Sequence, residues 1–231
     1  MDKVNNFLLS GYFMGVFDLL FNPDNFLRDE VKQNRAIWRG LTVVIVASIL
    51  TAVNAYITSK PLSRAVYITL MKKNLEVARA ASQLVRLSIV FAPLSVIISW
   101  IVDSAILFAL SSIFGGKGKF RDTVKVVAYS FIPSIVVFPF KCYIAINEAK
   151  LVELIGISAL QNSVFYTANS ILSLAVLAWQ FLFWKYGIKN ARNLNDKHAT
   201  IVSAIFTVAL LILAILGLLY RSFSVSGGTF K

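Results

Sequence analysis

The amino-acid sequence predicts an all-α integral membrane protein with five transmembrane helices, an N-terminal interfacial helix and an amphipathic helix before the second span. Three observations predict this class: apolar residues make up 58% of the 231 residues, charged residues make up only 15%, and the charges leave long gaps. A typical soluble domain has about 25% charged residues. A chain this apolar has too little polar surface for an ordinary soluble enzyme and is too hydrophobic for a disordered one.

The five spans follow from the gaps between charges. The gaps are residues 40–59, 87–116, 126–140, 154–184 and 199–220, and the second contains a single charge, Asp103. A helix that crosses a bilayer needs about 20 mostly apolar residues. The third gap reaches this length if Lys125 and Lys141 extend their ammonium groups to the two interfaces. The predicted spans are near 38–58, 88–114, 122–146, 163–187 and 198–220.

The third predicted span contains Pro133 and Pro139. Proline removes a backbone donor and clashes with the preceding turn, so we expect a kink or a break there.

Lysine and arginine residues predict the orientation, because they are enriched on the cytoplasmic side of a membrane. If the N-terminus is cytoplasmic, 13 of the 23 Lys and Arg residues lie on the inside. Of the ten on the outside, six lie in the segment 59–87, which is the main feature against this orientation. We therefore expect a multi-pass protein with its N-terminus in the cytoplasm, in the cell membrane if the source is prokaryotic.

The first of the two additional helices is predicted over residues 7–21. This apolar stretch is interrupted by Asp18, follows no basic region and precedes no small-residue cleavage site, so it is not a signal peptide. We interpret it as a juxtamembrane or interfacial helix that ends at Asn22-Pro23.

The second additional helix is amphipathic. Its narrow apolar seam recurs at spacings of three and four residues: Met71, Leu75, Ala78, Ser82 and Val85. Nothing interrupts the pattern before Pro93, so the helix is expected to continue into the second span. It either lies at the interface or packs on a neighbouring helix, or it docks a partner or a second copy of the chain as a homo-oligomer.

The polar residues do not form a catalytic or cofactor-binding pattern. The sequence has one cysteine, Cys142, and one histidine, His198, which excludes an internal disulfide and a metal site built from several Cys or His residues. Residues 115–119 lack the spacing of a phosphate-binding loop and suit a tight turn between the second and third spans. Charge this sparse does not indicate a nucleic-acid binder. We therefore predict no enzyme activity and no cofactor.

Asp103 is the one carboxylate well inside a predicted span. An ionisable group at bilayer depth marks either an ion or proton pathway or a structural polar contact. The first alternative would make the protein a transporter, a channel or an accessory subunit of a transport complex. Lys125 is the nearest candidate partner, but its depth differs from that of Asp103 by about two turns, roughly 10 Å.

Residues 118–133 read Gly-Lys-Phe-Arg-Asp-Thr-Val-Lys-Val-Val-Ala-Tyr-Ser-Phe-Ile-Pro. This block resembles the signature of the Yip family, multi-span membrane proteins first known as interactors of Rab-type GTPases. Two weaker matches are Leu20-Phe21-Asn22-Pro23 with Phe26, and Trp184-Lys185-Tyr186-Gly187-Ile188. The resemblance implies five spans and a cytosolic N-terminus, here a segment 1–36 followed by a membrane domain 37–231.

The resemblance also marks a candidate interaction or structural motif: Gly118, Phe120, Asp122, Lys125, Tyr129, Ser130 and Pro133. Physically, Gly118 suits a turn, Asp122 or Thr123 can cap a helix, and Tyr129, Ser130 and Pro133 can shape a kinked helix. Family members that bind GTPases have a long cytosolic N-terminal region, whereas the short segment 1–36 resembles that of prokaryotic members. A small GTPase partner is therefore implied only by the family resemblance. The predicted function is a non-enzymatic scaffold or trafficking and membrane-organisation factor that binds protein partners or membrane lipids.

Overall fold

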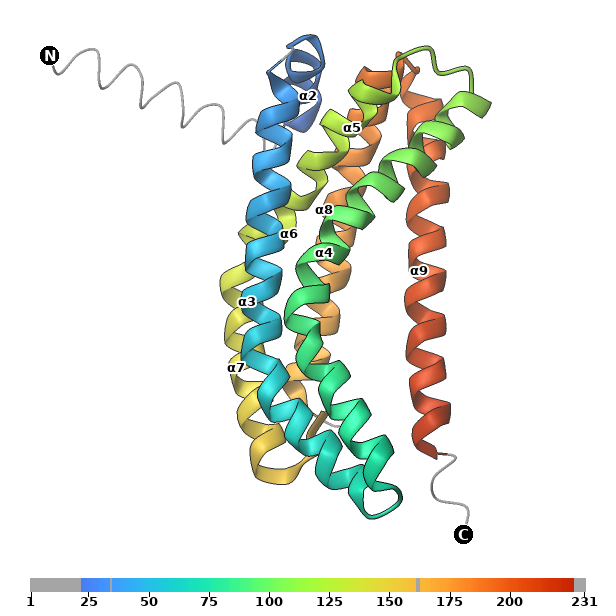
Figure 1. Cartoon of the computed structure of the whole chain (residues 1–231). Coiled ribbons are helices and arrows are strands. Elements are labelled where there is room, and N and C mark those ends of the chain that lie inside the picture. Colours follow the sequence, from blue (N-terminus) through green and yellow to red (C-terminus); the bar gives the residue numbers. More distant parts are fainter. Residues whose placement is uncertain (1–21, 34, 161–162, 227–231) are drawn as a thin grey trace, which may run out of the picture.

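The computed structural model describes residues 22–33, 35–160 and 163–226, which form a bundle of helices (Figure 1). The helices in chain order are α2 (Pro23–Lys32), α3 (Ala36–Met71), α4 (Leu75–Ile113), α5 (Phe120–Ala128), η1 (Tyr129–Phe131), α6 (Ile132–Val136), α7 (Phe138–Ile155), η2 (Ile157–Leu160), α8 (Val164–Arg192) and α9 (Asp196–Ser226). The long helices alternate in direction, so α2, the loop between α4 and α5, and the turn between α8 and α9 lie at one end (Figure 1). We call this the α2 end.

The predicted fold class is confirmed. The helices α3, α4, α8 and α9 are each long and apolar enough to cross a membrane. The pair Phe120–Val136 and Phe138–Ile155 passes the same test as one span that is bent by 53°. Each predicted span falls within one of these elements or extends beyond its end by a single residue.

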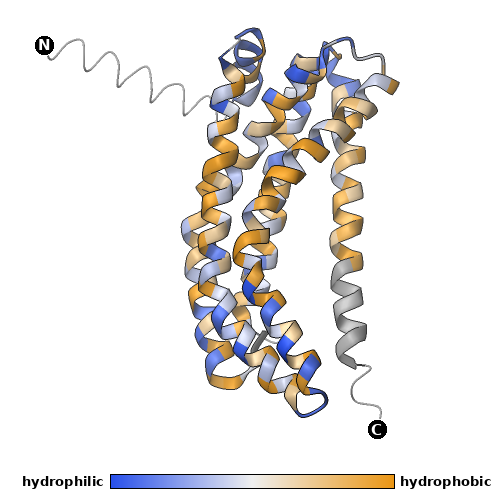
Figure 2. Cartoon of the chain, in the orientation of Figure 1, coloured by the Kyte–Doolittle hydropathy of each residue, from blue (hydrophilic) through white to orange (hydrophobic). Residues whose placement is uncertain are grey.

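The outer surface of the bundle has the polarity expected of a membrane protein. Apolar residues dominate the middle of the helices and polar residues gather toward the ends (Figure 2). On α4, large apolar side chains such as Val90, Phe91 and Ile98 are more than half exposed. Exposed apolar side chains at this depth face lipid rather than water.

The third span breaks where its two prolines predict. Pro133 cannot donate to the carbonyl of Tyr129, and the chain there tightens into η1, in which the N–H of Ile132 donates to Tyr129 instead. Pro139 cannot donate to Ile135, and a new helix, α7, begins at Phe138. The break exists because two successive prolines each remove one hydrogen bond of the helical ladder.

The amphipathic helix is confirmed, with a later start than the seam indicated. Met71 ends α3, and α4 begins at Leu75, because the side chain of Asn74 accepts hydrogen bonds from the backbone N–H groups of Glu76 and Val77. The seam residues Ala78 and Ser82 are buried against α3. Residues 59–71, for which the sequence suggested no helix, continue α3, so α3 and α4 form a helical hairpin longer than a bilayer is thick.

The predicted interfacial helix over 7–21 lies outside the described residues. The structure adds a helix that the sequence analysis missed, α2, directly after Asn22-Pro23. Pro23 occupies the first turn, Asp24 follows it, and Lys32 lies in the last turn, which are the signals of a helix start and end. Asn22-Pro23 was interpreted only as the end of a preceding helix, although the same pair also favours the beginning of another.

The largest group of buried apolar side chains surrounds α5, near the α2 end. Leu27 of α2, Leu107 of α4, Phe183 of α8 and Val202 of α9 are all fully buried there. The indole Nε1 of Trp100 donates to the backbone carbonyl of Val124 at 2.9 Å and joins α4 to α5. The helices are thus packed most tightly around the block that resembles the family signature.

Candidate functional site

The signature block 118–133 forms the centre of the α2 end. Residues 123–133 are all buried, and α5 contacts α2, α3, α4 and α8. Close approach between α3 and α5 occurs at Gly40, where an added Cβ would lie 2.9 Å from Cβ of Ala128. The structure brings most of the predicted motif residues into contact with neighbouring helices.

Gly118 lies against the backbone of α8. An added Cβ would lie 1.7 Å from the carbonyl oxygen of Ala191, so no larger residue fits without moving one of the two segments. The preceding residue, Lys117, donates its backbone N–H to the carbonyl of Arg192 at 2.9 Å. The glycine predicted for a turn is therefore needed for close packing between the α4–α5 loop and the end of α8.

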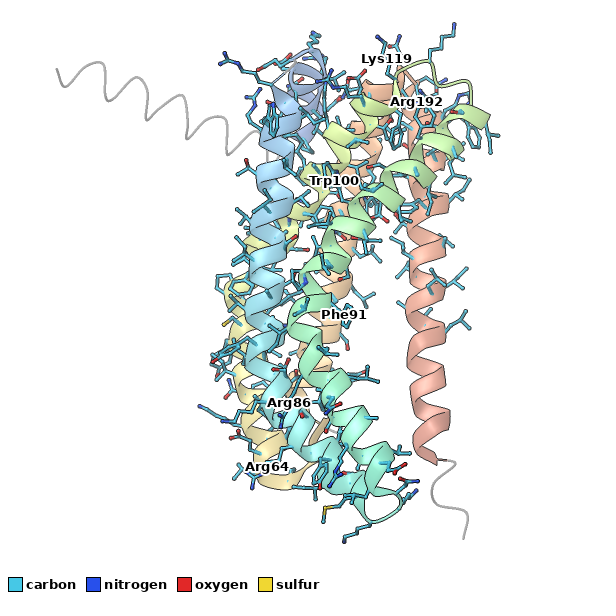
Figure 3. All side chains as sticks on the ribbon, in the orientation of Figure 1. Arg64, Arg86, Phe91, Trp100, Lys119 and Arg192 are labelled. Carbon is cyan, nitrogen blue, oxygen red and sulfur yellow. The ribbon has the colours of Figure 1, made fainter. Side chains whose placement is uncertain are left out.

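Arg192 holds the same loop from the other side, and no sequence signal marked it. Its side chain is buried and donates to Ser111 Oγ at 2.9 Å, Ser112 Oγ at 2.8 Å and the carbonyl of Gly116 at 2.7 Å. The guanidinium also lies 4.0 Å from the ring centroid of Phe108. Lys119 and Arg192 are seen at this end in Figure 3.

Tyr129 binds a buried carboxylate of α2. Its hydroxyl donates to Glu30 Oε2 at 2.7 Å, and Arg39 Nη1 of α3 lies 3.0 Å from Glu30 Oε1. Only 3% of Glu30 is exposed, so both carboxylate oxygens need these partners. Phe26 packs edge-on against the ring of Tyr129, with 5.2 Å between centroids. One motif residue thus fixes α2 through a polar and an aromatic contact.

Lys125 makes a second connection to α2. Its ammonium lies 2.8 Å from Asp122 Oδ1 and donates to the backbone carbonyl of Val31 at 3.3 Å, in the last turn of α2. A cation is favourable there because the last carbonyls of a helix lack helical partners. Lys125 therefore turns toward α2 and Asp122, and not toward Asp103.

The capping prediction for Asp122 and Thr123 is wrong. The N-cap of α5 is Lys119, and no side chain caps this helix. Because α5 begins at Phe120, Asp122 lies inside its first turn and pairs with Lys125 instead. Thr123 is fully buried, and its Oγ1 has no hydrogen-bond partner in the structure.

The remaining motif residues lie on either side of this contact region. Ser130 is buried and donates to the carbonyl of Val127 at 2.8 Å, which stabilises the helix locally. Pro133 is fully buried and opens α6. Phe120 is 41% exposed, with its ring packed edge-on against Phe108 at 5.4 Å. Phe120 is therefore the motif side chain that reaches the surface.

The first turn of α2 is attached to α8 by charge. Asp24 Oδ2 lies 2.6 Å from the ammonium of Lys189, and Asn190 donates to Asp24 Oδ1 at 2.8 Å. Burial alone would raise the pKa of Asp24, but the hydrogen bonds from Lys189 and Asn190, with the positive charges of Lys189 and Arg28, outweigh it. The pKa of Asp24 therefore lies below its ordinary value of 3.8.

The outer face of the α2 end is cationic. Exposed Lys and Arg side chains lie on α2, on the α4–α5 loop, at the start of α5 and at the start of α9: Arg28, Lys32, Lys117, Lys119, Arg121 and Lys197. We call these residues the cationic surface. The exposed carboxylates Asp29 and Asp196 each lie within 4 Å of a lysine, so they add little free negative charge.

Asp103 is not part of this region. It is half-buried on α4, one residue before the fully buried Ser104, and it lines none of the cavities described below. Its place on the helix agrees with a residue inside the second span, while its role as an ion pathway or a structural contact stays a prediction.

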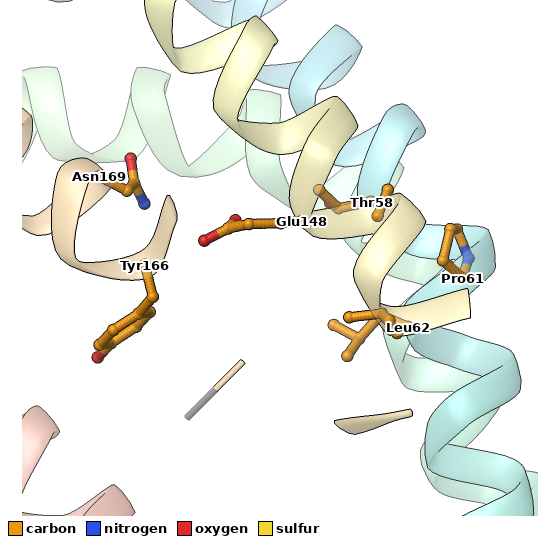
Figure 4. A pocket seen from close by; sticks show the side chains of 8 residues that line it. Thr58, Pro61, Leu62, Glu148, Tyr166 and Asn169 are labelled. Atoms are coloured by element: carbon orange, nitrogen blue, oxygen red, sulfur yellow. The ribbon is translucent and has the colours of Figure 1, made fainter. Parts of the chain in front are cut away.

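Two polar cavities lie farther along the bundle. One of about 250 Å³ is bounded by α3, α7 and α8, and Glu148 points from α7 toward Tyr166 and Asn169 (Figure 4). The other, of about 170 Å³, adjoins the break between α6 and α7 and is lined by Asn54 and Lys141 among others. Lys141, expected at an interface, therefore faces a cavity beside α3.

We expect Gly118→Ala to destabilise the fold by about 3 kcal/mol, because its Cβ would overlap the Ala191 carbonyl and force the α4–α5 loop away from Arg192. The measurement is the thermal unfolding midpoint of the purified protein in detergent. Gly187→Ala is the matched control: its Cβ would lie 3.1 Å from Val126 Cγ2, a side chain that can shift, so a loss of about 1 kcal/mol is expected. Equal midpoints for the two variants would contradict the close approach at Gly118.

The lowered pKa of Asp24 predicts an acid-sensitive attachment of α2. Its contribution to stability is fully present above the ordinary, unfolded-state pKa of 3.8, and is lost as the pH falls through the lower folded-state pKa. Asp24→Asn should therefore unfold at a lower temperature than the wild type at pH 7, and this difference should shrink below about pH 4. Asp29→Asn is the control, because Asp29 is 69% exposed and lies 3.9 Å from Lys32. A difference between wild type and Asp24→Asn that does not change with pH would refute the ionic attachment.

Comparison with known proteins identifies the family. The model of the Yip1 domain matches residues 17–219, which include α2, the signature block and most of the described helices. The uncharacterized protein MJ0794 of Methanocaldococcus jannaschii is 26% identical to this chain over 123 residues, 53% of this chain and 82% of the relative. No solved structure matches the chain. The domain match covers far more than half of the sequence, and the bent, signature-bearing span lies at the centre of the bundle; the chain therefore belongs to the Yip1 domain family of multi-pass membrane proteins.

Proposed function

We propose that this protein is a non-enzymatic membrane scaffold that binds a protein partner through the cationic surface at its α2 end. The observation that carries the proposal is that the helices and loops bearing these exposed cations are held together by buried contacts. A surface on rigidly held elements binds with a smaller loss of conformational entropy than a flexible one.

The contacts of α2 support a rigid surface. Its first turn is held by Lys189 and Asn190 of α8. Its last turn is held by Tyr129 and Arg39 through Glu30, and by Lys125 through the carbonyl of Val31. Two loops, between α4 and α5 and between α8 and α9, lie at the same end of the bundle (Figure 1). Their positions are in turn fixed by Arg192 and by the close approach of Gly118 to α8.

The chemistry of the surface indicates the kind of partner. Exposed Lys119 and Arg121, which flank the exposed Phe120 in sequence, fit an acidic protein surface that also presents an apolar residue. Electrostatic complementarity of this kind raises association rates and falls with salt. The proposal therefore includes a salt-sensitive interaction.

The proposal also places the α2 end in the cytoplasm. The predicted inside segments contain 13 of the 23 Lys and Arg residues, and cations near the ends of spans favour the cytoplasmic side. A partner would then be a soluble cytoplasmic protein or the cytoplasmic part of another membrane protein.

Capture of partners from native membranes tests the proposal. We expect wild-type protein to recover at least one reproducible partner, and Lys119→Gln with Arg121→Gln to recover roughly fivefold less, because two cations of the surface are lost. Lys72→Gln with Lys73→Gln is the control, since these exposed lysines lie in the α3–α4 turn at the opposite end. Recovery of the protein alone, or an equal loss with both pairs, would refute the proposed surface.

Orientation is checked in the same samples. A single cysteine at Asn25, in a Cys142→Ser background, should be shielded from a membrane-impermeant maleimide in intact cells and label after permeabilisation. Labelling of this single-cysteine protein in intact cells would refute a cytoplasmic α2 end. The same labelling of the Lys119→Gln with Arg121→Gln variant would show whether the loss of two cations has reversed insertion.

A second candidate function is a component of a transport system. The observation in its favour is the polar cavity at the broken span, where the ammonium of Lys141 and the buried Asn54 Oδ1, which has no hydrogen-bond partner, line the same space. Broken helices and intramembrane charges mark many transport sites. If this candidate is correct, purified protein in liposomes should carry a proton flux above that of empty liposomes, and Lys141→Gln should abolish it. Flux equal to that of empty liposomes would exclude proton transport.

A further inference from the structure

We propose that the end of the bundle opposite α2 holds one anionic phospholipid, with its phosphate among Lys60, Arg86 and Lys150 and an acyl chain in the groove between α3 and α4. This site is distant from the cationic surface and does not depend on the proposed scaffold function. It uses two of the six cations in the segment 59–87 that orientation alone left unexplained.

The headgroup part of the site is a cavity of about 600 Å³ between α3, α4 and α7. Three cations from three different helices line it: Lys60 from α3, Arg86 from α4 and Lys150 from α7. The one acidic group in its lining is Glu153, and no carboxylate in the described part of the chain forms an ion pair with any of the three cations. The lining therefore carries an excess of positive charge that a phosphate would neutralise.

Arg86 is oriented by buried polar contacts. Its Nε donates to Ser63 Oγ at 3.0 Å, and Ser63, which is fully buried, donates to the backbone carbonyl of Ser82 at 3.0 Å. This arrangement uses Nε and leaves both Nη groups to donate to a ligand. A guanidinium held in this way is suited to two parallel hydrogen bonds with phosphate oxygens. Arg86 and Arg64 are seen near this end in Figure 3.

The acyl-chain part of the site is an apolar groove of about 450 Å³ between α3 and α4. Most of its lining residues are aliphatic. The full lining is Ile45, Ser48, Ile49, Ala52, Val53, Tyr56, Ile89, Pro93 and Ile97. Tyr56 and Ile89 line the cationic cavity as well, so the two spaces adjoin at these side chains. From residue 45 to residue 56 the groove follows α3 for about 16 Å, close to the thickness of one leaflet of the hydrocarbon core, about 15 Å.

The depth of the cavity agrees with a phosphate position. Lys60 directly follows the uncharged residues 40–59, and Arg86 directly precedes the long gap that begins at residue 87. Both cations therefore mark the edge of the hydrocarbon region, where lipid phosphates lie, while the groove extends along the uncharged parts of the same helices. A zwitterionic lipid would bring its own cation into a cavity that already has three.

The test is native mass spectrometry of the full-length protein in detergent, titrated with dioleoyl phosphatidylglycerol or dioleoyl phosphatidylcholine. We expect one phosphatidylglycerol to be retained with an affinity about tenfold or more above that of phosphatidylcholine. The triple variant Lys60→Gln, Arg86→Gln and Lys150→Gln should lose this preference. Lys60→Gln with Lys150→Gln, which keeps the Arg86–Ser63 contact, should lose most of it and guards against misfolding of the triple variant.

The matched control is Lys72→Gln with Lys73→Gln and Arg79→Gln, which removes three exposed cations at the same end that line neither space. It should keep the preference for phosphatidylglycerol. Ala52→Phe, which fills the groove, should weaken lipid binding, and soluble glycerol phosphate should bind far more weakly than the lipid. Equal binding of the two lipids, equal effects of the two triple variants, or glycerol phosphate binding as tightly as the lipid would each overturn the proposal.

Discussion

The buried carboxylate of Glu30 is the interaction on which the arrangement of the α2 end depends. A carboxyl group with almost no contact with water is stable only if each of its oxygens has a hydrogen-bond or ionic partner. Arg39 and Tyr129 supply these partners from α3 and from the signature block. Removing the Tyr129 hydroxyl would leave a buried carboxylate oxygen without its partner, which costs about 1–3 kcal/mol. The short helix α2, which also buries Leu27 in the core, is thereby held in one position relative to two spans.

The broken span explains how the signature block reaches these partners. In a straight helix of the same length, the signature block would have to follow the same axis as the rest of the span. The two prolines instead divide the span into α5, α6 and α7, and the first of these is free to cross the bundle between α3, α4 and α8. Glycine is required where the chain enters this crossing, because the backbone of α8 leaves no space for a side chain at Gly118. The family signature is therefore mainly a description of one buried crossing helix and its contacts.

Cations at the two ends of the molecule differ in their surroundings. At the α2 end, three cationic side chains form ion pairs or hydrogen bonds inside the bundle: Lys125, Lys189 and Arg192. The exposed cations of this end lie on segments that these contacts hold in place. At the opposite end, Lys60, Arg86 and Lys150 line one cavity that adjoins an apolar groove. Net charge alone, +12 for the chain, does not distinguish a surface for a partner from a site for a lipid phosphate. The distinction comes from what lies beside each cation.

The sequence by itself determined the membrane class, the approximate spans and the break, because each follows from local chemistry: uncharged stretches of sufficient length, and prolines that cannot donate a hydrogen bond. It also determined the family, through the block that ends at Pro133. It did not reveal α2, whose short, polar sequence has no long apolar face, nor the role of Arg192, whose partners are about 80 residues away. The cap proposed at Asp122 failed for a related reason, since the start of α5 is set by packing against α8. Only the tertiary structure decided which charges are paired, because ion pairs between distant helices depend on how the helices pack and leave no periodic signal in the chain.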